Sequence, residues 1–283
     1  MIHKIPAMSP APLYIVATPI GNLDDITLRA LQVLAAADLV AAEDTRRSRV
    51  LRAHHGIDRP LTALHEHNEE SQAAKLVSRM LDGASVALIS DAGTPLVSDP
   101  GYRLVAAALQ SGLEVIAIPG PSAVTAALSV SGLPTDRFAF EGFLPARAAA
   151  RQKRLADLRE EPRTLVFFES SHRIAASLAD LERVFGAARE AAVCRELTKQ
   201  FETVLRGTLS EVRRQVEEDA NQRKGEFVLV VAGRSEAADD QLLRAVELAA
   251  ALKEHLGASQ AARVAARIHG ASRRDVYQAM ETD

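Results

Sequence analysis

The 283-residue sequence contains one cysteine and no tryptophan, and aromatic residues make up 4% of it. A lone Cys194 excludes an internal disulfide framework and favours a reducing compartment, so we expect a cytoplasmic protein. Without thiol pairs, a zinc site would need clustered histidines; His65 and His67 lack a visible third ligand and are better explained as part of a polar loop. We therefore expect no metal.

Long hydrophobic runs are also missing. No stretch approaches the roughly 20 apolar residues of a membrane helix, so we expect no membrane contact. Three prolines precede Leu13 without a hydrophobic signal core, which predicts a short unstructured lead-in. Basic surplus is absent too: the net charge is −3, so any nucleic-acid binding must come from local basic patches.

The chain that remains is 47% apolar and 25% charged, and its length predicts two domains with a small appendage. In the first half, short apolar runs alternate with stretches of helical periodicity, which predicts a mostly parallel sheet. The predicted strands cover residues 13–17, 38–42, 61–64, 86–89 and 114–118, with a helix at 69–81.

The second half has more closely spaced strands, which predicts a mixed sheet. We expect strands near 137–140, 163–168, 193–196, 203–206 and 226–231, and helices near 147–159 and 210–218, with another helix that Ser170 and Ser171 open. Residues 235–240 have the composition of a linker. The predicted fold class is thus α/β, with domains at 13–119 and 120–234 and a helical appendage at 241–283 that is too small to hold a core alone.

Residues 90–101 are the most unusual stretch. They directly follow the strand predicted at 86–89 and combine two glycines, two prolines, two aspartates and two serines. Gly93 and Gly101 permit backbone angles closed to other residues, whereas Pro95 and Pro100 fix theirs. Because open α/β sheets bind ligands at the carboxyl ends of their strands, we expect this loop to be functional.

Three other loops lie at the same predicted edge: residues 18–23, 43–47 and 119–123. Asp24 or Asp25 is expected to cap the helix after the first loop, and Ser122 the helix after the third, as are Ser259 and Ser272 farther along. The second loop, with Asp44 and Arg46, is explained equally well as a helix cap with surface ion pairs.

These motifs together resemble the ribosomal RNA small subunit methyltransferase I family of the tetrapyrrole methylase superfamily. The resemblance covers about residues 13–233 and rests on the loops at 18–23, 43–46, 90–101 and 119–123, and on matches at 142–145, 169–173, 195–199 and 224–228. Two positions depart from the pattern: Thr94 stands where the wider superfamily has aspartate, as is usual in the RNA-directed branch, and Ser171 stands where that branch generally has proline.

The resemblance implies a two-domain tetrapyrrole-methylase-like fold, a homodimer, and S-adenosylmethionine as methyl donor in the cleft between the domains. It implies methylation of the 2′-hydroxyl of a cytidine in small-subunit (16S) ribosomal RNA. Small residues would hold the donor and phenylalanines would cover its adenine, with Phe227 better explained as core. The expected donor-binding residues are Pro19, Gly21, Asp91, Gly93, Thr94, Val97, Ser122, Ala123, Phe143, Leu144 and Phe168.

A ribose hydroxyl must lose its proton to a general base within hydrogen-bonding reach. We expect Asp44 and Arg46, with Glu43, to face the acceptor, and Asp91 to shape the cleft floor. Other loop groups could serve as the base, including a lysine of lowered pKa; these are Glu169, Glu196, His172 and Lys199.

Two basic clusters are candidate RNA contacts. One is formed by Arg147, Arg151, Lys153 and Arg154, and the other by Arg263, Arg267 and Arg274, which would share a helix face. The alternative for the appendage is that it supports the dimer. For the whole chain, the alternatives are a precorrin or uroporphyrin methyltransferase and a non-catalytic RNA binder in ribosome assembly.

Overall fold

The computed structural model describes residues 9–234 and 238–281; residues 1–8, 235–237 and 282–283 lie outside that description. Most of the expected lead-in and half of the expected linker therefore lie outside the described residues, and residues 238–240 belong to a helix. The chain divides into two compact units, one ending at Ala232 and the other beginning at Gly233. None of the described helices is both long enough and apolar enough to span a bilayer.

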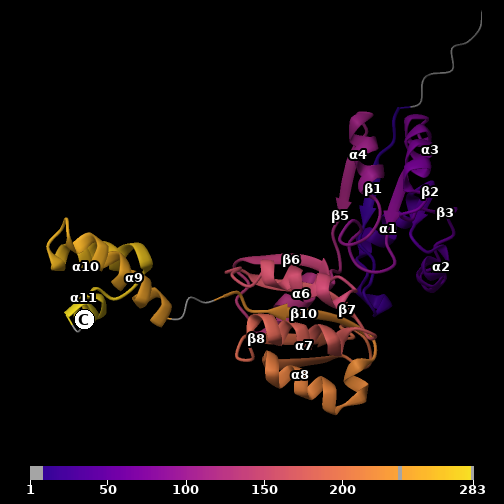
Figure 1. Ribbon diagram of the computed structural model, residues 1–283. Coiled ribbons are helices and arrows are strands. Elements are labelled where there is room, and N and C mark those ends of the chain that lie inside the picture. The colour runs from indigo at the N-terminus through magenta and orange to yellow at the C-terminus, as the bar shows by residue number, and fades with distance from the viewer. Residues whose placement is uncertain (1–8, 235–237, 282–283) are drawn as a thin grey trace, which may run out of the picture. The chain divides into compact units, whose positions relative to one another are not determined.

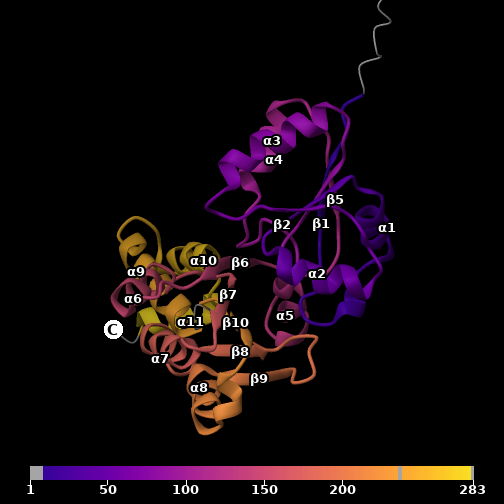
Figure 2. The same cartoon turned by 90° about the vertical axis from the view of Figure 1, so that its right-hand side faces the viewer.

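The first sheet is parallel throughout, as predicted, with strand order β3-β2-β4-β1-β5. Strands β2 and β4 are buried along their whole length because helices cover both faces. Helices α1 and α2 pack on one face, and α3 and α4 on the other (Figures 1 and 2). The elements are β1 (Leu13–Val16), α1 (Leu28–Ala36), β2 (Leu39–Ala42), α2 (Thr45–His54), β3 (Leu61–Ala63), α3 (Glu69–Leu81), β4 (Val86–Ile89), α4 (Tyr102–Gln110) and β5 (Val115–Ile118).

Strands β1 and β4 are neighbours, but they lead to helices on opposite faces of the sheet. Such a reversal opens a crevice at the carboxyl ends of the two strands. The loops that follow them are tied together there: Thr18 N–H donates to Gly93 O at 2.9 Å, and Gly93 N–H donates to Thr18 O at 3.0 Å. The buried Glu69 carboxylate fixes the far end of the second loop, accepting from the amides of Gly101 and Arg103 at 3.0 and 2.7 Å.

The second sheet is mixed, as predicted, with order β6-β7-β10-β8-β9 and a parallel pair only at β6 and β7. Helix α5 covers one face, and α6, α7 and α8 cover the other. The elements are α5 (Ala123–Ser131), β6 (Phe138–Phe143), α6 (Ala148–Asp157), β7 (Thr164–Ser170), α7 (Ile174–Phe185), β8 (Glu190–Arg195), β9 (Thr203–Thr208), α8 (Leu209–Glu218) and β10 (Glu226–Val231), with 3-10 turns at Leu23–Asp25 and Ala220–Arg223.

Several predicted helix starts are wrong. Thr27 caps α1, because Asp24 and Asp25 belong to a 3-10 turn capped by Asn22. Helix α7 starts at Ile174, since β7 continues through Ser170. Ser122 does precede α5, but its side chain makes no cap bond.

The second unit is a three-helix cluster of α9 (Ala238–Lys253), α10 (Ala258–His269) and α11 (Arg273–Glu281). The expectation that it could hold no core is wrong: alanines let the helices approach closely around buried Ala245, Ala249, Ala262, Ala265 and Val276. Ser259 lies inside α10, which follows Gly257, whereas Ser272 accepts from Asp275 N–H at 3.5 Å at the start of α11. Gly270 ends α10 in the left-handed conformation, so Arg274 lies on a different helix from Arg263 and Arg267.

Candidate functional site

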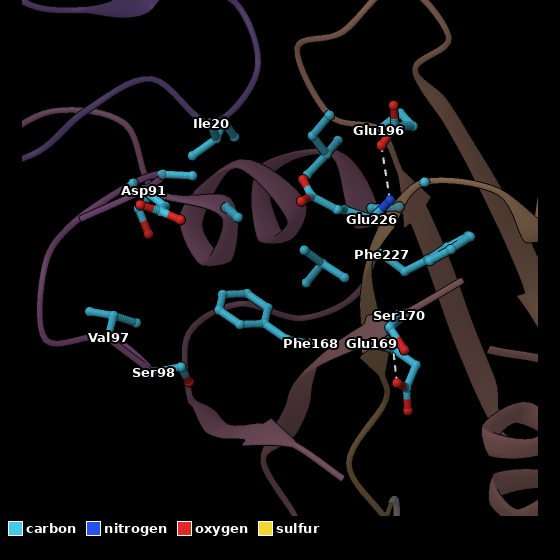
Figure 3. Close-up of a pocket in the computed structure, with 18 of the residues that line it drawn as sticks. Ile20, Asp91, Val97, Ser98, Phe168, Glu169, Ser170, Glu196, Glu226 and Phe227 are labelled. Carbon is cyan, nitrogen blue, oxygen red and sulfur yellow. Dashed lines mark hydrogen bonds between the residues drawn. The ribbon is translucent and has the colours of Figure 1, made fainter. Parts of the chain in front are cut away.

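A cavity of about 510 Å³, here called the larger cavity, lies between the carboxyl edge of the first sheet and the second sheet. Figure 3 shows Ile20 and Asp91 on one side of it, with Phe168, Phe227, Glu196 and Glu226 extending from the strands and turns of the other side. Its volume falls in the range of about 300–1,000 Å³ that is typical of small-molecule sites. Each wall is made of different chemical groups.

Three carboxylates form the wall on the first sheet. Glu43 follows β2, and Asp91 and Asp99 lie on the loop after β4. Burial raises the pKa of Asp99 to about 6, and the negative charges of Glu43 and Asp91 add to the rise. Burial and the Asp91 charge likewise raise the pKa of Glu43. Asp99 is therefore suited to taking up a proton near neutral pH, and Glu43 takes one up more readily than an ordinary carboxylate.

Helix α2 holds Asp91 in place. Its N-cap residue, Asp44, donates its main-chain N–H to Asp91 Oδ1 at 3.0 Å, and Arg47 Nη1 lies 3.4 Å from Asp91 Oδ2. The Asp44 side chain points to its own helix, where it accepts from Arg46 N–H at 2.8 Å and pairs with the Arg46 guanidinium at 3.0 Å. Asp44 and Arg46 thus form the predicted cap with its ion pair, while Arg47 reaches the cavity.

Main-chain groups border the cavity between the two sheets. Gly93 and Thr94 lie beside Ser122 and Ala123, and Thr94 Oγ1 donates to Pro121 O at 3.2 Å, which ties the loop after β4 to the start of α5. The first amides of a helix have no partner within the helix. These amides and the Ser122 hydroxyl are therefore available to a ligand.

The opposite wall is apolar. Phe168 on β7 contacts Phe140 and Phe143 edge to face, with ring centroids 4.8 and 5.6 Å apart. Phe143 is 54% exposed at the cavity rim, although phenylalanine is among the residue types that are most often buried. Phe227 and Cys194 are buried behind this wall, and burial raises the pKa of the thiol to about 12. This surface suits a flat apolar ring.

An ion cluster closes one end of the cavity. Lys199 Nζ lies 2.9 Å from Glu196 Oε1 and 2.7 Å from Glu226 Oε2. Burial would lower the pKa of Lys199, but the two carboxylates outweigh it and hold this pKa above its usual value. A lysine base of lowered pKa is therefore excluded at this position. Likewise, burial would raise the pKa of Glu196, but the Lys199 ammonium and the Glu226 amide hold it below its usual value.

The turn that carries this cluster touches the loop after β1. Glu196 and Thr198 both have positive φ, of 50° and 67°, and Thr198 Oγ1 accepts from Asn22 N–H at 3.1 Å. Gly21 makes the approach possible, because a Cβ there would lie 2.4 Å from Lys199 Cγ. The first and second sheets are thus connected directly beside the cavity.

Glu169 is fully engaged, although it borders the cavity. Its oxygens accept from Ser177 Oγ at 2.6 Å and from Ser170 N–H at 2.7 Å, and its side chain pairs with Arg173 at 2.8 Å with no exposed surface. Arg173 in turn donates to Leu144 O at 3.0 Å. This network holds the end of β7 and does not present a free base. His172, another candidate base, is exposed and does not border the cavity.

The structure gathers most of the predicted donor residues. Around the larger cavity lie Asp91, Gly93, Thr94, Val97, Ser122, Ala123, Phe143 and Phe168, with Glu43 from the predicted acceptor side. Pro19 and Gly21 instead line a second cavity beside it. The expectation that Leu144 contacts the donor is wrong, because this side chain is 3% exposed and packs in the core beneath α6 and α7.

Several residues of the larger cavity were not singled out from the sequence. Ser98 and Asp99 belong to the loop at 90–101, and Arg47 stands next to the predicted Arg46, so their neighbours gave a usable signal. Glu226 belongs to a motif that was noted without a role. Ile20, Leu197 and Val228 are ordinary apolar residues whose sequence context does not distinguish them from core.

The basic clusters differ in how freely their side chains reach solvent. Arg147 and Lys153 are exposed, and Arg154 pairs with Glu141. The expectation that Arg151 contacts RNA is wrong. This side chain is 5% exposed and pairs with Asp180 at 2.7 Å, so it cannot hold a phosphate. Arg263, Arg267 and Arg274 are all exposed. Within the described ranges, no group of three or more His, Cys, Asp and Glu side chains could hold a metal ion.

Comparisons with known proteins agree with this arrangement. Residues 12–213 match the model of the Tetrapyrrole (Corrin/Porphyrin) Methylases, and residues 235–282 match that of an RsmI C-terminal HTH domain. The chain is 55% identical over 269 residues to the ribosomal RNA small subunit methyltransferase I of Xylella fastidiosa strain Temecula1, covering 95% of this chain and 98% of that protein. It is 51% identical over 276 residues to the protein of the same name from Pseudomonas aeruginosa, covering 96% and 97%.

A solved structure supports the fold. Uroporphyrin-III C-methyl transferase from Thermus thermophilus, complexed with S-adenyl homocysteine, superposes with a TM-score of 0.55 over 78% of this chain and 97% of that one. At 20% sequence identity, this likeness concerns the fold alone. The family model and the two sequence relatives lead to one conclusion: the chain belongs to the ribosomal RNA small subunit methyltransferase I family of the tetrapyrrole methylases.

Proposed function

We propose that this protein transfers a methyl group from S-adenosylmethionine to the 2′-hydroxyl of a cytidine in small-subunit (16S) ribosomal RNA. The observation that carries the proposal is the larger cavity, whose walls offer main-chain amides, an aromatic face and a carboxylate cluster in one space. Membership of the methyltransferase family supplies the reaction class.

The cavity fits the donor chemically. Its volume of about 510 Å³ accommodates a nucleoside with an amino-acid tail. Phe143 and Phe168 would cover the adenine, and the main chain at Gly93, Thr94 and Ala123 would approach the ligand without side-chain bulk. When bound, S-adenosylmethionine supplies an activated methyl group on a positively charged sulfur, which the carboxylate wall suits.

The carboxylate cluster is the proposed destination of the proton from the attacking hydroxyl. Asp91 is held from two sides by the Asp44 amide and Arg47, which fixes its direction. Glu43 and Asp99 stand beside it, and the negative charge of Asp91 contributes to the raised pKa of both. We assign Glu43, Asp91 and Asp99 to proton uptake, and Asp44 and Arg46 to positioning them through α2.

The other parts of the proposal concern the surroundings. The exposed Arg147, Lys153 and Arg154, with Arg263, Arg267 and Arg274 of the helical unit, would contact RNA phosphates. A homodimer is part of the proposal, as is a place in the cytoplasm where small subunits assemble.

The test is transfer of labelled methyl groups from S-adenosylmethionine to small subunits that lack the modification, followed by digestion to nucleosides. A labelled 2′-O-methylcytidine supports the proposal. Label on a base, or on a porphyrin supplied as competitor, contradicts it. A protein that binds subunits but transfers no label is a non-catalytic binder.

A further inference from the structure

A smaller cavity of about 290 Å³ adjoins the larger one, and the activity described above leaves it without a role. The two cavities share Ile20, Arg47, Asp91, Ala92, Lys199 and Glu226. Asp91 therefore borders both spaces. A group bound in the smaller cavity would lie next to Asp91 and next to a ligand of the larger one.

One part of the smaller cavity is apolar, although charged and hydroxyl side chains line the rest. Leu51 and Ile89 are buried in the floor, at 6% and 1% exposure. Val50 stands at the rim and is 62% exposed, although it lies on α2 among arginines. An apolar side chain at the rim over an apolar patch of floor suits the flat face of an unstacked RNA base.

Arg47 borders the smaller cavity and is only weakly paired with a carboxylate. Arg47 has a side chain that is 65% exposed, and its contact with Asp91 is long, at 3.4 Å. Lys199, by contrast, is held by two carboxylates at 2.9 and 2.7 Å. An anionic group entering the cavity would therefore meet Arg47, whose planar guanidinium matches phosphate geometry.

We propose that the smaller cavity holds the acceptor nucleotide of the RNA, with its base against Val50 and Leu51, its phosphate at Arg47 and its ribose beside Asp91. This inference rests on the proposed function and adds the location of the acceptor. It makes Arg47, rather than Arg46, the arginine that contacts the substrate.

Two variants test whether the acceptor nucleotide binds in the smaller cavity, and each has a matched control. Arg47→Gln removes the phosphate contact, and Arg49→Gln removes an equal charge from an exposed position of the same helix that borders neither cavity. Val50→Trp fills the rim, and Leu28→Trp adds the same bulk at a position that is 79% exposed on α1. All four sites are exposed, so the substitutions should leave the melting temperature close to that of the unchanged protein.

The measurements are methyl transfer to unmodified small subunits and the Kd for S-adenosylmethionine. R47Q should raise KM for subunits about tenfold, and it should also lower kcat because Asp91 loses one of its two contacts. V50W should lower kcat/KM about 100-fold by displacing the acceptor. Donor affinity should stay within twofold in both variants, and R49Q and L28W should match the unchanged protein.

The outcomes separate the two proposals. If the unchanged protein transfers no label, the proposed function fails and this inference fails with it. If it transfers label but R47Q equals R49Q, or V50W equals L28W, the proposed function stands and the acceptor seat is overturned. A loss of donor affinity in V50W would also overturn it, because the smaller cavity would then belong to the donor.

Discussion

The two sheets contribute to the larger cavity in different ways. The parallel sheet offers loops that leave the ends of its strands, and its wall consists of carboxylates and main-chain amides. The mixed sheet offers side chains from within its strands, such as Phe143 and Phe168, and a turn with two left-handed residues. The first wall is polar, and its carboxylates can gain or lose a proton. The second wall is apolar, and packing between its phenylalanine rings fixes its shape.

The largest effect is expected at the main chain of the polar wall. Gly93 has φ of +81° at the cavity, and Gly112 has φ of +72° in a turn with nothing within 4 Å of an added Cβ. Valine is strained in both places. Gly93→Val should weaken donor binding about 100-fold by displacing the loop, whereas Gly112→Val should cost stability alone.

Calorimetry with S-adenosylmethionine and thermal melting of both variants distinguish the two effects. Equal donor affinity in folded G93V and G112V would contradict a donor role for the loop after β4.

A smaller loss of donor affinity is expected at the ion cluster that closes one end of the larger cavity. Lys199→Met leaves the carboxylates of Glu196 and Glu226 without their cation, so donor affinity should fall about tenfold, which corresponds to about 1.4 kcal/mol. Lys224→Met, on an exposed side chain hydrogen-bonded to Asn221, is the control.

The pH dependence of stability checks this assignment. The pKa of Lys199 is raised, so its contribution is present below its unfolded value of about 10.5 and is lost as the pH rises through the folded value. The pKa of Glu196 is lowered, so its contribution is lost as the pH falls below about 4.5. The difference between K199M and the unchanged protein should be constant from about pH 5 to 10; a slope within that window would contradict the cluster as described.

Asp44 tests whether the polar wall acts through caps or through direct contact. Its side chain caps α2, so Asp44→Ala should lower the melting temperature and reduce turnover a few-fold by loosening Asp91. Asp44→Ser keeps a capping oxygen and should retain both properties. If serine and alanine each lower turnover 100-fold, Asp44 touches the acceptor, as the sequence pattern predicts.

Replacing Asp99 is expected to stabilise the protein, whereas replacing Asp44 by alanine destabilises it. Its pKa of about 6 means that the folded state holds the proton more tightly than the unfolded state. Stability therefore falls as the pH rises from about 4 to about 6 and is then constant. Asp99→Asn should be more stable than the unchanged protein at pH 7, on the order of 1 kcal/mol after solvent screening, and equal to it below about pH 4.

Chemical denaturation at pH 4, 6 and 7 measures this difference, with the exposed Asp157→Asn as control. The absence of a pH-dependent gain in D99N would show that Asp99 is well solvated.

The smallest effect per residue is expected outside both walls. Replacing Arg263, Arg267 and Arg274 by glutamine should raise KM for subunits and flatten the salt dependence of RNA binding by about one unit of slope per lost phosphate contact. Donor affinity should not change. An unaltered salt slope with a shift toward monomer in sedimentation would instead assign the helical unit to a dimer.

The parallel half of the fold was predictable because its signals are local. Helix α3 begins and ends at the predicted residues, and β4 does too, since a continuous apolar run between turn residues marks a buried strand. The loop after β4 was recognised for its dense mixture of glycine, proline and acids. Its partner Glu43 was found because it ends a neighbouring strand.

The rest of the site depends on contacts that no local pattern reveals. Arg151 stands among exposed basic residues in the sequence, yet helical periodicity turns it toward Asp180 of α7. Leu144 follows the exposed Phe143 and points to the opposite face of the chain. Glu226 reaches the cavity because β10 pairs with β8 and brings it to Lys199, a meeting set by register between distant segments.

Strand β1 is synthesised before the other strands of its sheet, yet in the sheet it lies between β4 and β5. Leu13 pairs with Val86 on one side and with Val115 on the other, so its place exists only after residues up to 118 have been synthesised. Until then its apolar side chains stay exposed or are held by transient contacts. Pairings this distant fold slowly because loop closure must precede them. The bridge between Thr18 and Gly93 joins the loops after β1 and β4, so it should become stable only once β4 and β5 have both been synthesised.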